Sequence, residues 1–168
     1  MNFNNFTIKS QEAVQKSVEF TREASNQAIE PIHLLKAVVS VGDSLVNFIF
    51  QKIGANITQL TTLINREISL LPKVSGGEPY LSRASNDVLH LSLDLAKKNG
   101  DEYVTLESIL MSLFKIKSPA SMILKDIGLS EEELNLAIKE LRKGKTVTNQ
   151  SAEDTYNALS KYAINLNE

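Results

Sequence analysis

One stretch of this chain occurs twice, and this duplication restricts the possible folds more than any other feature of the sequence. Residues 29–38 read IEPIHLLKAV, and residues 104–113, which lie 75 positions later, read VTLESILMSL. In the first copy Glu30 can cap a helix that begins with Pro31, and apolar residues follow at helical spacing. The second copy has the same kind of apolar pattern, so we expect two related helical units.

The same offset relates the neighbouring helices. Thr7 is the expected N-cap of an amphipathic first helix, and Ser82 opens the matching helix 75 residues later. The third helix of each unit is expected to stop at a glycine, and these glycines, Gly54 and Gly128, are 74 residues apart. The fourth helices begin with capping-box patterns, at residues 56–59 and 130–133.

These helices predict an all-α fold of two four-helix repeats, over residues 7–70 and 82–142. A period of about 75 residues is longer than the common solenoid repeats, and two units do not make an array. We therefore expect the repeats to pack about a pseudo-twofold axis and to form one globular domain over residues 1–142.

Three other segments lack the pattern of a core helix. Residues 71–80 contain two prolines and two glycines, which is typical of a linker between repeats. Residues 143–151 are polar and predict a linker that acts as a mobile tether. The apolar residues within 152–168 are too few to form a core, so we expect this segment to begin a following domain.

The composition is that of an ordinary globular domain, with 42% hydrophobic and 23% charged residues. The net charge of −2 gives no electrostatic reason to expect nucleic acid or an anionic membrane as a partner. No apolar run reaches the length of a membrane span, and the N-terminus lacks the pattern of a signal peptide. The absence of cysteine excludes disulfides and cysteine-ligated metal sites, and it fits a reducing compartment.

The sequence shows no catalytic or metal-binding motif. The histidines, His33 and His90, do not have the spacing of a zinc motif, and Gly76-Gly77 lacks the pattern of a phosphate-binding loop. We therefore assign no catalytic, metal or cofactor site to this chain. A helical domain of this kind offers a groove between its repeats, and such grooves bind extended or helical segments through apolar contacts.

The repeats resemble the amino-terminal Clp repeat domain of the AAA+ unfoldase chaperones. The resemblance rests on the first helix capped by Thr7, on IEPIHLL at residues 29–35 and on GDEYVTLE at residues 100–107. The stretch VTNQSAEDTYNALSKY, at residues 147–162, is similar to the segment that joins this domain to the first ATPase domain in the disaggregase branch. The resemblance thus covers essentially the whole chain, and residues 152–168 would start that ATPase domain.

The resemblance implies that the full-length protein is a cytoplasmic, ATP-driven homohexameric ring. Such rings thread aggregated polypeptide through their pore together with a DnaK-type chaperone system. The present chain would be the substrate-engaging domain, monomeric in isolation, with unfolded or aggregated proteins as partners. It contains no Walker A motif, so ATP and Mg²⁺ would bind elsewhere in the full-length protein, and the chain alone is not expected to be an enzyme.

In disaggregase relatives, a threonine at the first helix and two acidic residues of the second repeat are linked to substrate engagement. The matching residues here are Thr7, Asp101 and Glu107, which the resemblance implies to be substrate-binding. A structural role is equally open, because Thr7 can act only as a cap and Glu107 can serve only the dipole of its helix. Leu106 and Ser108 replace the proline and histidine of the first repeat, which leaves the chemistry of the groove open.

Two other classes of function are alternatives. In the protease-linked branches the same domain recruits adaptor proteins or marked substrates, so adaptor docking is the second hypothesis. An enzyme of unknown type is the third, and no residue spacing supports it. The sequence after Glu168 would discriminate between the first two. A Walker A motif followed by a long coiled-coil insertion indicates a disaggregase, and a protease-docking tripeptide loop indicates the other branch.

Overall fold

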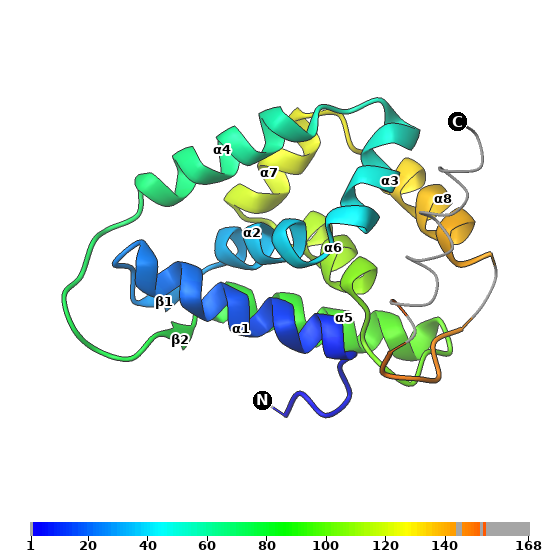
Figure 1. Cartoon of the computed structure of the whole chain (residues 1–168), viewed down its shortest axis with the longest axis horizontal. Helices are drawn as coiled ribbons and strands as arrows, with labels where there is room; N and C mark the ends of the chain where they lie inside the picture. The colour runs from blue at the N-terminus through cyan, green and yellow to red at the C-terminus, as the bar shows by residue number, and fades with distance from the viewer. Residues whose placement is uncertain (1, 144–145, 152, 154–168) are drawn as a thin grey trace.

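The computed structural model describes residues 2–143, 146–151 and 153, and within this part of the chain the helices form two matching sets of four (Figure 1). The first set contains α1 (Ile8–Glu23), α2 (Pro31–Val41), α3 (Asp43–Ile53) and α4 (Ile57–Ser69). The second set contains α5 (Arg83–Lys98), α6 (Leu106–Lys115), α7 (Pro119–Asp126) and α8 (Glu131–Arg142). Two short strands are β1 (Ala28–Ile29) and β2 (Tyr80–Leu81). The predicted all-α fold of two four-helix repeats is confirmed.

Polar caps fix where the helices begin. Thr7 Oγ1 accepts a hydrogen bond from the N–H of Ser10 at 3.1 Å, and Ser82 Oγ accepts one from the N–H of Ser85 at 3.1 Å. These bonds satisfy donors in the first turns of α1 and α5 that have no partner inside the helix. The same kind of bond is made by the N-cap residues of three further helices, Asn56, Ser118 and Ser130.

The two repeats exchange contacts across the pseudo-twofold axis. β1 pairs in parallel with β2, so that Ile29 of the first repeat faces Leu81, which precedes α5 of the second. A parallel bridge joins Phe6, which precedes α1, to Val104, which precedes α6. Shifting one pair by 75 positions gives the other pair with the roles of the repeats reversed. This exchange is what a twofold relation between the repeats requires.

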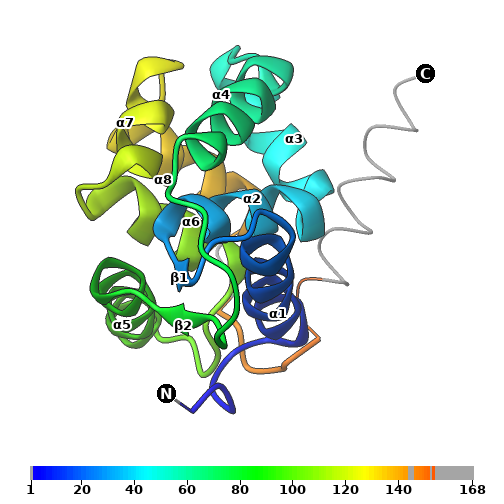
Figure 2. The ribbon, with the colours of Figure 1, turned by 90° about the vertical axis from the view of Figure 1, so that its left-hand side faces the viewer.

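The helices lie in layers around a core that both repeats share. α2 and α6 lie in the centre and contact each other, with α1 and α5 below them and α4 and α7 above them (Figures 1 and 2). Contacts cross between the repeats, because α3 packs on α8 and α4 packs on α7. The buried apolar residues of both repeats form one cluster. The two repeats therefore stabilise each other.

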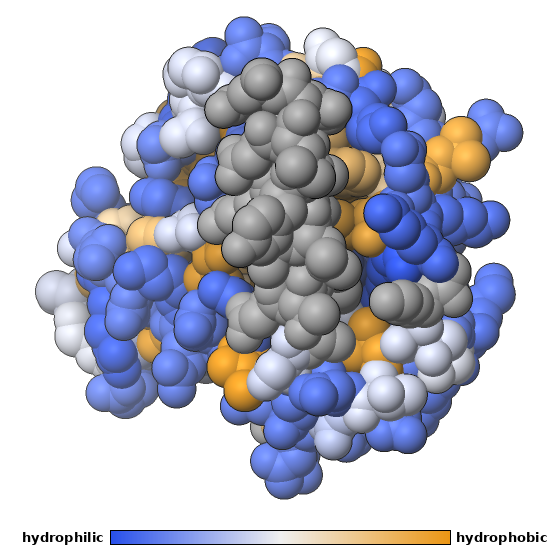
Figure 3. All heavy atoms as spheres, turned by 45° about the vertical axis from the view of Figure 1, so that its right-hand side comes forward, coloured by the Kyte–Doolittle hydropathy of each residue, from blue (hydrophilic) through white to orange (hydrophobic). Residues whose placement is uncertain are grey.

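The surface combines hydrophilic residues with small hydrophobic patches, as Figure 3 shows for one face. Among the described residues, no single helix is long and apolar enough to cross a membrane. The consecutive helices α2 and α3, bent by 96°, reach that length and composition only as a pair. Most of α2 is buried in the domain, and core helices commonly have such a composition.

The described part of the segment expected to be a mobile tether is hydrogen-bonded to the helical body. Val147 is buried, and its carbonyl oxygen accepts the N–H of Glu102 at 2.7 Å. The carbonyl oxygen of Gln150 accepts the N–H of Ile8, the first residue of α1, at 3.0 Å. The structure differs from the expectation because a single apolar residue can anchor a polar run without giving it periodicity. Residues 144–145, 152 and 154–168 lie outside the described residues, so the expected start of a following domain stays a prediction.

Candidate functional site

Two of the three residues expected to bind substrate, Asp101 and Glu107, meet at Arg142 in the last turn of α8. Arg142 Nη1 lies 2.6 Å from Asp101 Oδ2, and Arg142 Nη2 lies 3.3 Å from Glu107 Oε1. Nη2 also donates to Thr105 Oγ1 at 2.8 Å. Arg142 therefore ties the end of α8 both to the loop before α6 and to the first turn of α6.

Thr7, the third expected residue, lies at the start of α1 and contacts the same loop through its backbone. Its N–H donates to the carbonyl oxygen of Val104 at 3.0 Å, while its side chain caps α1. The hydroxyl group also donates to Ser10 Oγ at 2.9 Å. The hydroxyl of Thr7 is therefore used by its own helix.

All three expected residues are buried in this conformation. The exposed fraction is 0% for Thr7, 7% for Asp101 and 1% for Glu107. A buried polar group that is already hydrogen-bonded gains little from a partner unless its surroundings open. The geometry gives Thr7 and Asp101 supporting positions, whereas Glu107 also lines a groove. Their role in substrate binding stays a prediction.

A second anchor reaches the start of α6 from beyond α8. Asp101 Oδ1 accepts the N–H of Val147 at 2.8 Å, and Glu153 Oε2 accepts the N–H of Leu106 at 2.7 Å. Leu106 is the first residue of α6, so a carboxylate at this point satisfies a helix donor and complements the helix dipole. The position of α6 thus depends on residues before it, on α8 and on the segment after α8.

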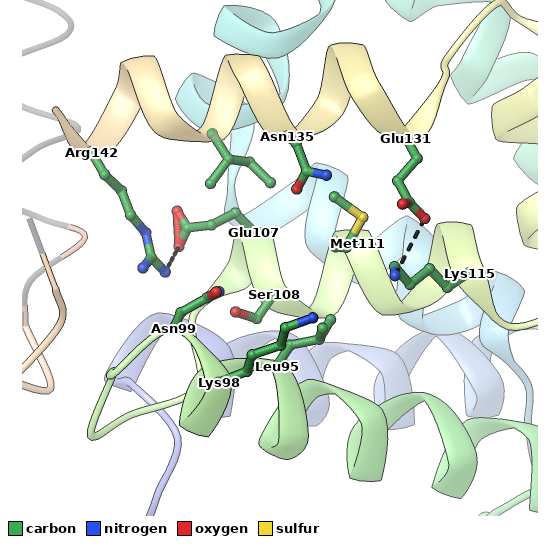
Figure 4. A pocket seen from close by; sticks show the side chains of 11 residues that line it. Leu95, Lys98, Asn99, Glu107, Ser108, Met111, Lys115, Glu131, Asn135 and Arg142 are labelled. Carbon is green, nitrogen blue, oxygen red and sulfur yellow. Dashed lines mark hydrogen bonds and ion pairs between the residues drawn. The ribbon is translucent and has the colours of Figure 1, made fainter. Parts of the chain in front are cut away.

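A groove of about 180 Å³ opens beside Glu107, between α5, α6 and α8 (Figure 4). We call it the second-repeat groove. Its apolar lining comes from Leu95, Met111 and Ile138, one from each of these helices. The sequence predicted a groove between the repeats, but this groove lies within one repeat. The reason is that core side chains of both repeats fill the interface between them.

Ion pairs lie at both ends of the second-repeat groove (Figure 4). The pair of Arg142 with Glu107 lies at one end, and the pair of Lys115 with Glu131, at 3.3 Å, lies at the other. Such a site can take an apolar side chain of a peptide between charged groups that face its polar backbone or its neighbours. The groove therefore has the chemistry of a polypeptide-binding site.

His33 has a structural explanation. It is fully buried, its Nδ1 accepts the N–H of Glu30 at 2.9 Å, and its Nε2 lies 2.9 Å from Asn26 Oδ1. Because Nδ1 is an acceptor, the proton of the neutral ring is on Nε2 and is donated to Asn26. Burial, and to a lesser extent the charge of Lys36, lowers the pKa of His33 to about 4. His33 therefore stays neutral and connects the start of α2 to the loop before it.

Comparison with known families decides the assignment of this fold. The model of the Clp repeat (R) N-terminal domain matches residues 5–127. The chain belongs to this family. Its helices thus form a Clp repeat domain, as the duplicated stretch and the residues at 100–107 indicated.

Named relatives of this Clp repeat domain are ClpB-type chaperones. The chain is 58% identical, over 168 residues and its full length, to "Chaperone protein ClpB" of Bacteroides thetaiotaomicron, of which it covers 20%. It is 54% identical over 166 residues, 99% of its length, to the protein of the same name from Porphyromonas gingivalis, of which it covers 19%. The chain therefore spans about a fifth of the length of these relatives, and it is an N-terminal domain of the ClpB type.

A solved structure shares the fold of this Clp repeat domain. The Hsp104 N-terminal domain from Candida albicans superposes with a TM-score of 0.79 at 20% sequence identity. The match covers 89% of this chain and 99% of the other. The arrangement of helices is thus common to Clp repeat domains whose sequences have diverged widely.

Within this Clp repeat domain, Arg142 and Glu153 are contacts that the sequence analysis did not find. A basic residue in the last turn of a helix is common, because it complements the dipole, so Arg142 gave no sign of a buried ion pair. Glu153 is 47 residues from Leu106, and no local pattern links them. The usable signal was the repeat itself, since Asp101 occupies the position of Asn26, whose side chain also anchors the loop before a second helix.

Proposed function

We propose that this chain is the substrate-engaging N-terminal domain of a ClpB-type disaggregase, and that it binds short segments of unfolded or aggregated polypeptide. The observation that carries the proposal is the second-repeat groove, with its apolar lining between two ion pairs. An unfolded segment exposes apolar side chains next to polar backbone groups, which is what this lining complements. The kinship with ClpB-type chaperones supports the same assignment.

The remaining parts of the proposed protein supply the ATP-dependent steps. In this proposal ATP and Mg²⁺ bind to domains outside the present chain, which form a homohexameric ring in the cytoplasm and work with a DnaK-type chaperone system. The chain itself catalyses no reaction and passes the bound segment to the ring. The support for these points is the resemblance to ClpB-type relatives, of which this chain covers about a fifth.

The affinity of the isolated chain for an unfolded segment should be weak. A single domain has few contact sites, and no ring supplies avidity. Because the contacts are mainly apolar, raised salt should change the affinity only modestly.

The test is a titration of the 168-residue chain with a permanently unfolded model protein, followed by backbone amide shifts. Shifts should concentrate on residues of α5, α6 and α8 that line the second-repeat groove. Leu95→Ala, which removes apolar lining from α5, should weaken binding several-fold. Leu136→Ala is the matched control, because Leu136 is exposed on α8 and does not line this groove. Shifts spread evenly over the surface, or equal binding by both variants, would contradict the proposed function.

A further inference from the structure

The first repeat contains a groove at the position that corresponds to the second-repeat groove. This first-repeat groove, of about 200 Å³, lies between α1, α2 and α4. Seven residues line it, and five of them have counterparts among the lining residues of the second-repeat groove at offsets of 75 or 74. For example, Phe20 corresponds to Leu95 and Ile64 corresponds to Ile138. The duplication of the chain has therefore produced two equivalent grooves.

The lining of the two grooves differs in charge. The second-repeat groove includes the carboxylates of Glu107 and Glu131. The first-repeat groove has no acidic residue among the described residues that line it, and its charged lining residue is Lys36. The counterpart of Lys36 in the second repeat is the apolar Met111. The first-repeat groove is thus apolar and cationic, whereas the second-repeat groove has charges of both signs.

Lys36 is placed to receive an anionic group. Its Nζ lies 4.5 Å from the centre of the Phe20 ring, so the cation sits over the apolar lining of the groove. The Nζ of Lys16 lies 5.4 Å from the same ring, but Lys16 also pairs with Glu19 at 3.3 Å. Within the described residues Lys36 forms no ion pair with a carboxylate. A ligand carboxylate could therefore pair with Lys36 without displacing an internal partner.

We propose that the first-repeat groove is a second polypeptide-binding site, which takes an apolar or aromatic side chain next to an acidic residue. The apolar side chain packs against Phe20 and Ile64, and the neighbouring carboxylate pairs with Lys36. This inference rests on the proposed function, because the ligand is of the same class. Two sites on one rigid domain let a single unfolded chain bind at both, which raises its effective affinity.

The test uses two soluble twelve-residue peptides with the same Leu-Phe-Leu centre, one flanked by glutamates and one by lysines. Each is titrated into the 168-residue chain while backbone amide shifts are recorded. The glutamate peptide should shift amides in α1, α2 and α4 around the first-repeat groove. It should bind there about two- to fivefold more tightly than the lysine peptide, which is the range expected for one exposed ion pair.

Variants of Lys36 separate charge from apolar contact. Lys36→Gln should remove the preference for the glutamate peptide, and Lys36→Glu should reverse it. Lys115→Gln, the same change in the second-repeat groove, should leave the preference at the first-repeat groove unchanged. Circular dichroism of each variant checks that the fold is retained, and Lys36→Gln keeps the test valid if Lys36→Glu does not fold.

Each outcome has a separate meaning. Shifts confined to the second-repeat groove would overturn the second site and leave the proposed function standing. Shifts at the first-repeat groove that ignore both the peptide charge and Lys36→Glu would overturn the proposed selectivity. Shifts at neither groove, with either peptide or with the unfolded model protein, would overturn the proposed function together with this inference.

Discussion

Arg142 Nη1 lies 2.6 Å from Asp101 Oδ2, in a buried ion pair that joins the end of α8 to the loop before α6. The corresponding loop of the first repeat is anchored by a neutral pair, because Asn26, 75 residues before Asp101, hydrogen-bonds to His33. The two repeats therefore hold equivalent loops by different chemistry. The charged version also reaches Glu107, which lines the second-repeat groove.

Replacing Arg142 should destabilise the domain strongly. Arg142→Met keeps much of the apolar stem but removes the cation that the buried carboxylates of Asp101 and Glu107 contact. Breaking a buried ion pair by removing one partner costs about 3–5 kcal/mol. Urea unfolding measures this loss. Lys139→Met, at an exposed position of the same helix, should change the free energy of unfolding by less than about 0.5 kcal/mol. Similar small losses in both variants would show that the ion pairs contribute little.

The neutral anchor predicts a pH dependence of stability. The pKa of His33 is about 4 in the folded domain, against 6.5 for a free histidine. Between these values the unfolded chain binds a proton at His33 that the folded chain does not. The free energy of unfolding should therefore fall as the pH is lowered from 6.5 to about 4, by up to about 3 kcal/mol from this residue.

Two histidine variants isolate this effect in urea unfolding at a series of pH values. His33→Gln should lower stability at neutral pH but should flatten the slope between pH 6.5 and 4. His90→Gln is the matched control, because His90 is exposed on α5, and it should leave the slope unchanged. A slope that persists in His33→Gln would assign the pH dependence to other groups.

The helices could be predicted because their signals are local and occur twice. Thr7 and Ser82 cap helices in both repeats, and Gly54 ends α3 with a φ of 77°, a conformation that favours glycine. The exchange of contacts between the repeats could not be read directly, because Phe6 and Val104 are far apart in the sequence and no local pattern pairs them. The twofold axis followed only from the equality of the two units.

The candidate site was less predictable than the fold. The resemblance led to Glu107, which lines the second-repeat groove, but it also led to Thr7 and Asp101, which are buried and hydrogen-bonded. Sequence patterns show which side of a helix is apolar, but they do not show which helices diverge enough to leave a groove. Arg142 looked like an ordinary helix-end residue, since its partners come from another helix and its preceding loop.

Thr7 should prove to be a stabilising residue. Thr7→Ala removes the cap of α1 and should cost about 1 kcal/mol, because the N–H of Ser10 loses its partner. Thr7→Ser keeps the hydroxyl and should lose much less. Since Thr7 is fully buried, Thr7→Ser should bind the unfolded model protein as the parent does. Weaker binding by Thr7→Ser, at unchanged stability measured by thermal unfolding, would instead show that Thr7 contacts the substrate.

Gly42, between α2 and α3, should not tolerate a side chain. A Cβ atom there would lie 2.9 Å from Leu106 Cδ1 and 3.0 Å from the carbonyl oxygen of Val38. Gly42→Ala should therefore cost about 1–3 kcal/mol through overpacking where the first repeat meets α6. Leu106→Val removes the Cδ atoms, so the double variant should lose less stability than the sum of the single losses. Strictly additive losses in thermal unfolding would mean that Leu106 does not cause the strain.

The segment after α8 should be ordered where it contacts the body, contrary to the expectation of a mobile tether. Val147 is buried, and its N–H donates to Asp101 Oδ1 at 2.8 Å. Backbone NMR relaxation should therefore give Val147 an order parameter near that of the helices, about 0.85. Val147→Ser removes the apolar anchor and should lower the order parameters of residues 146–150. Thr148→Ser, at the adjacent exposed position, should leave them unchanged. Order parameters below about 0.6 across this segment in the parent chain would instead support the tether that the polar sequence suggested.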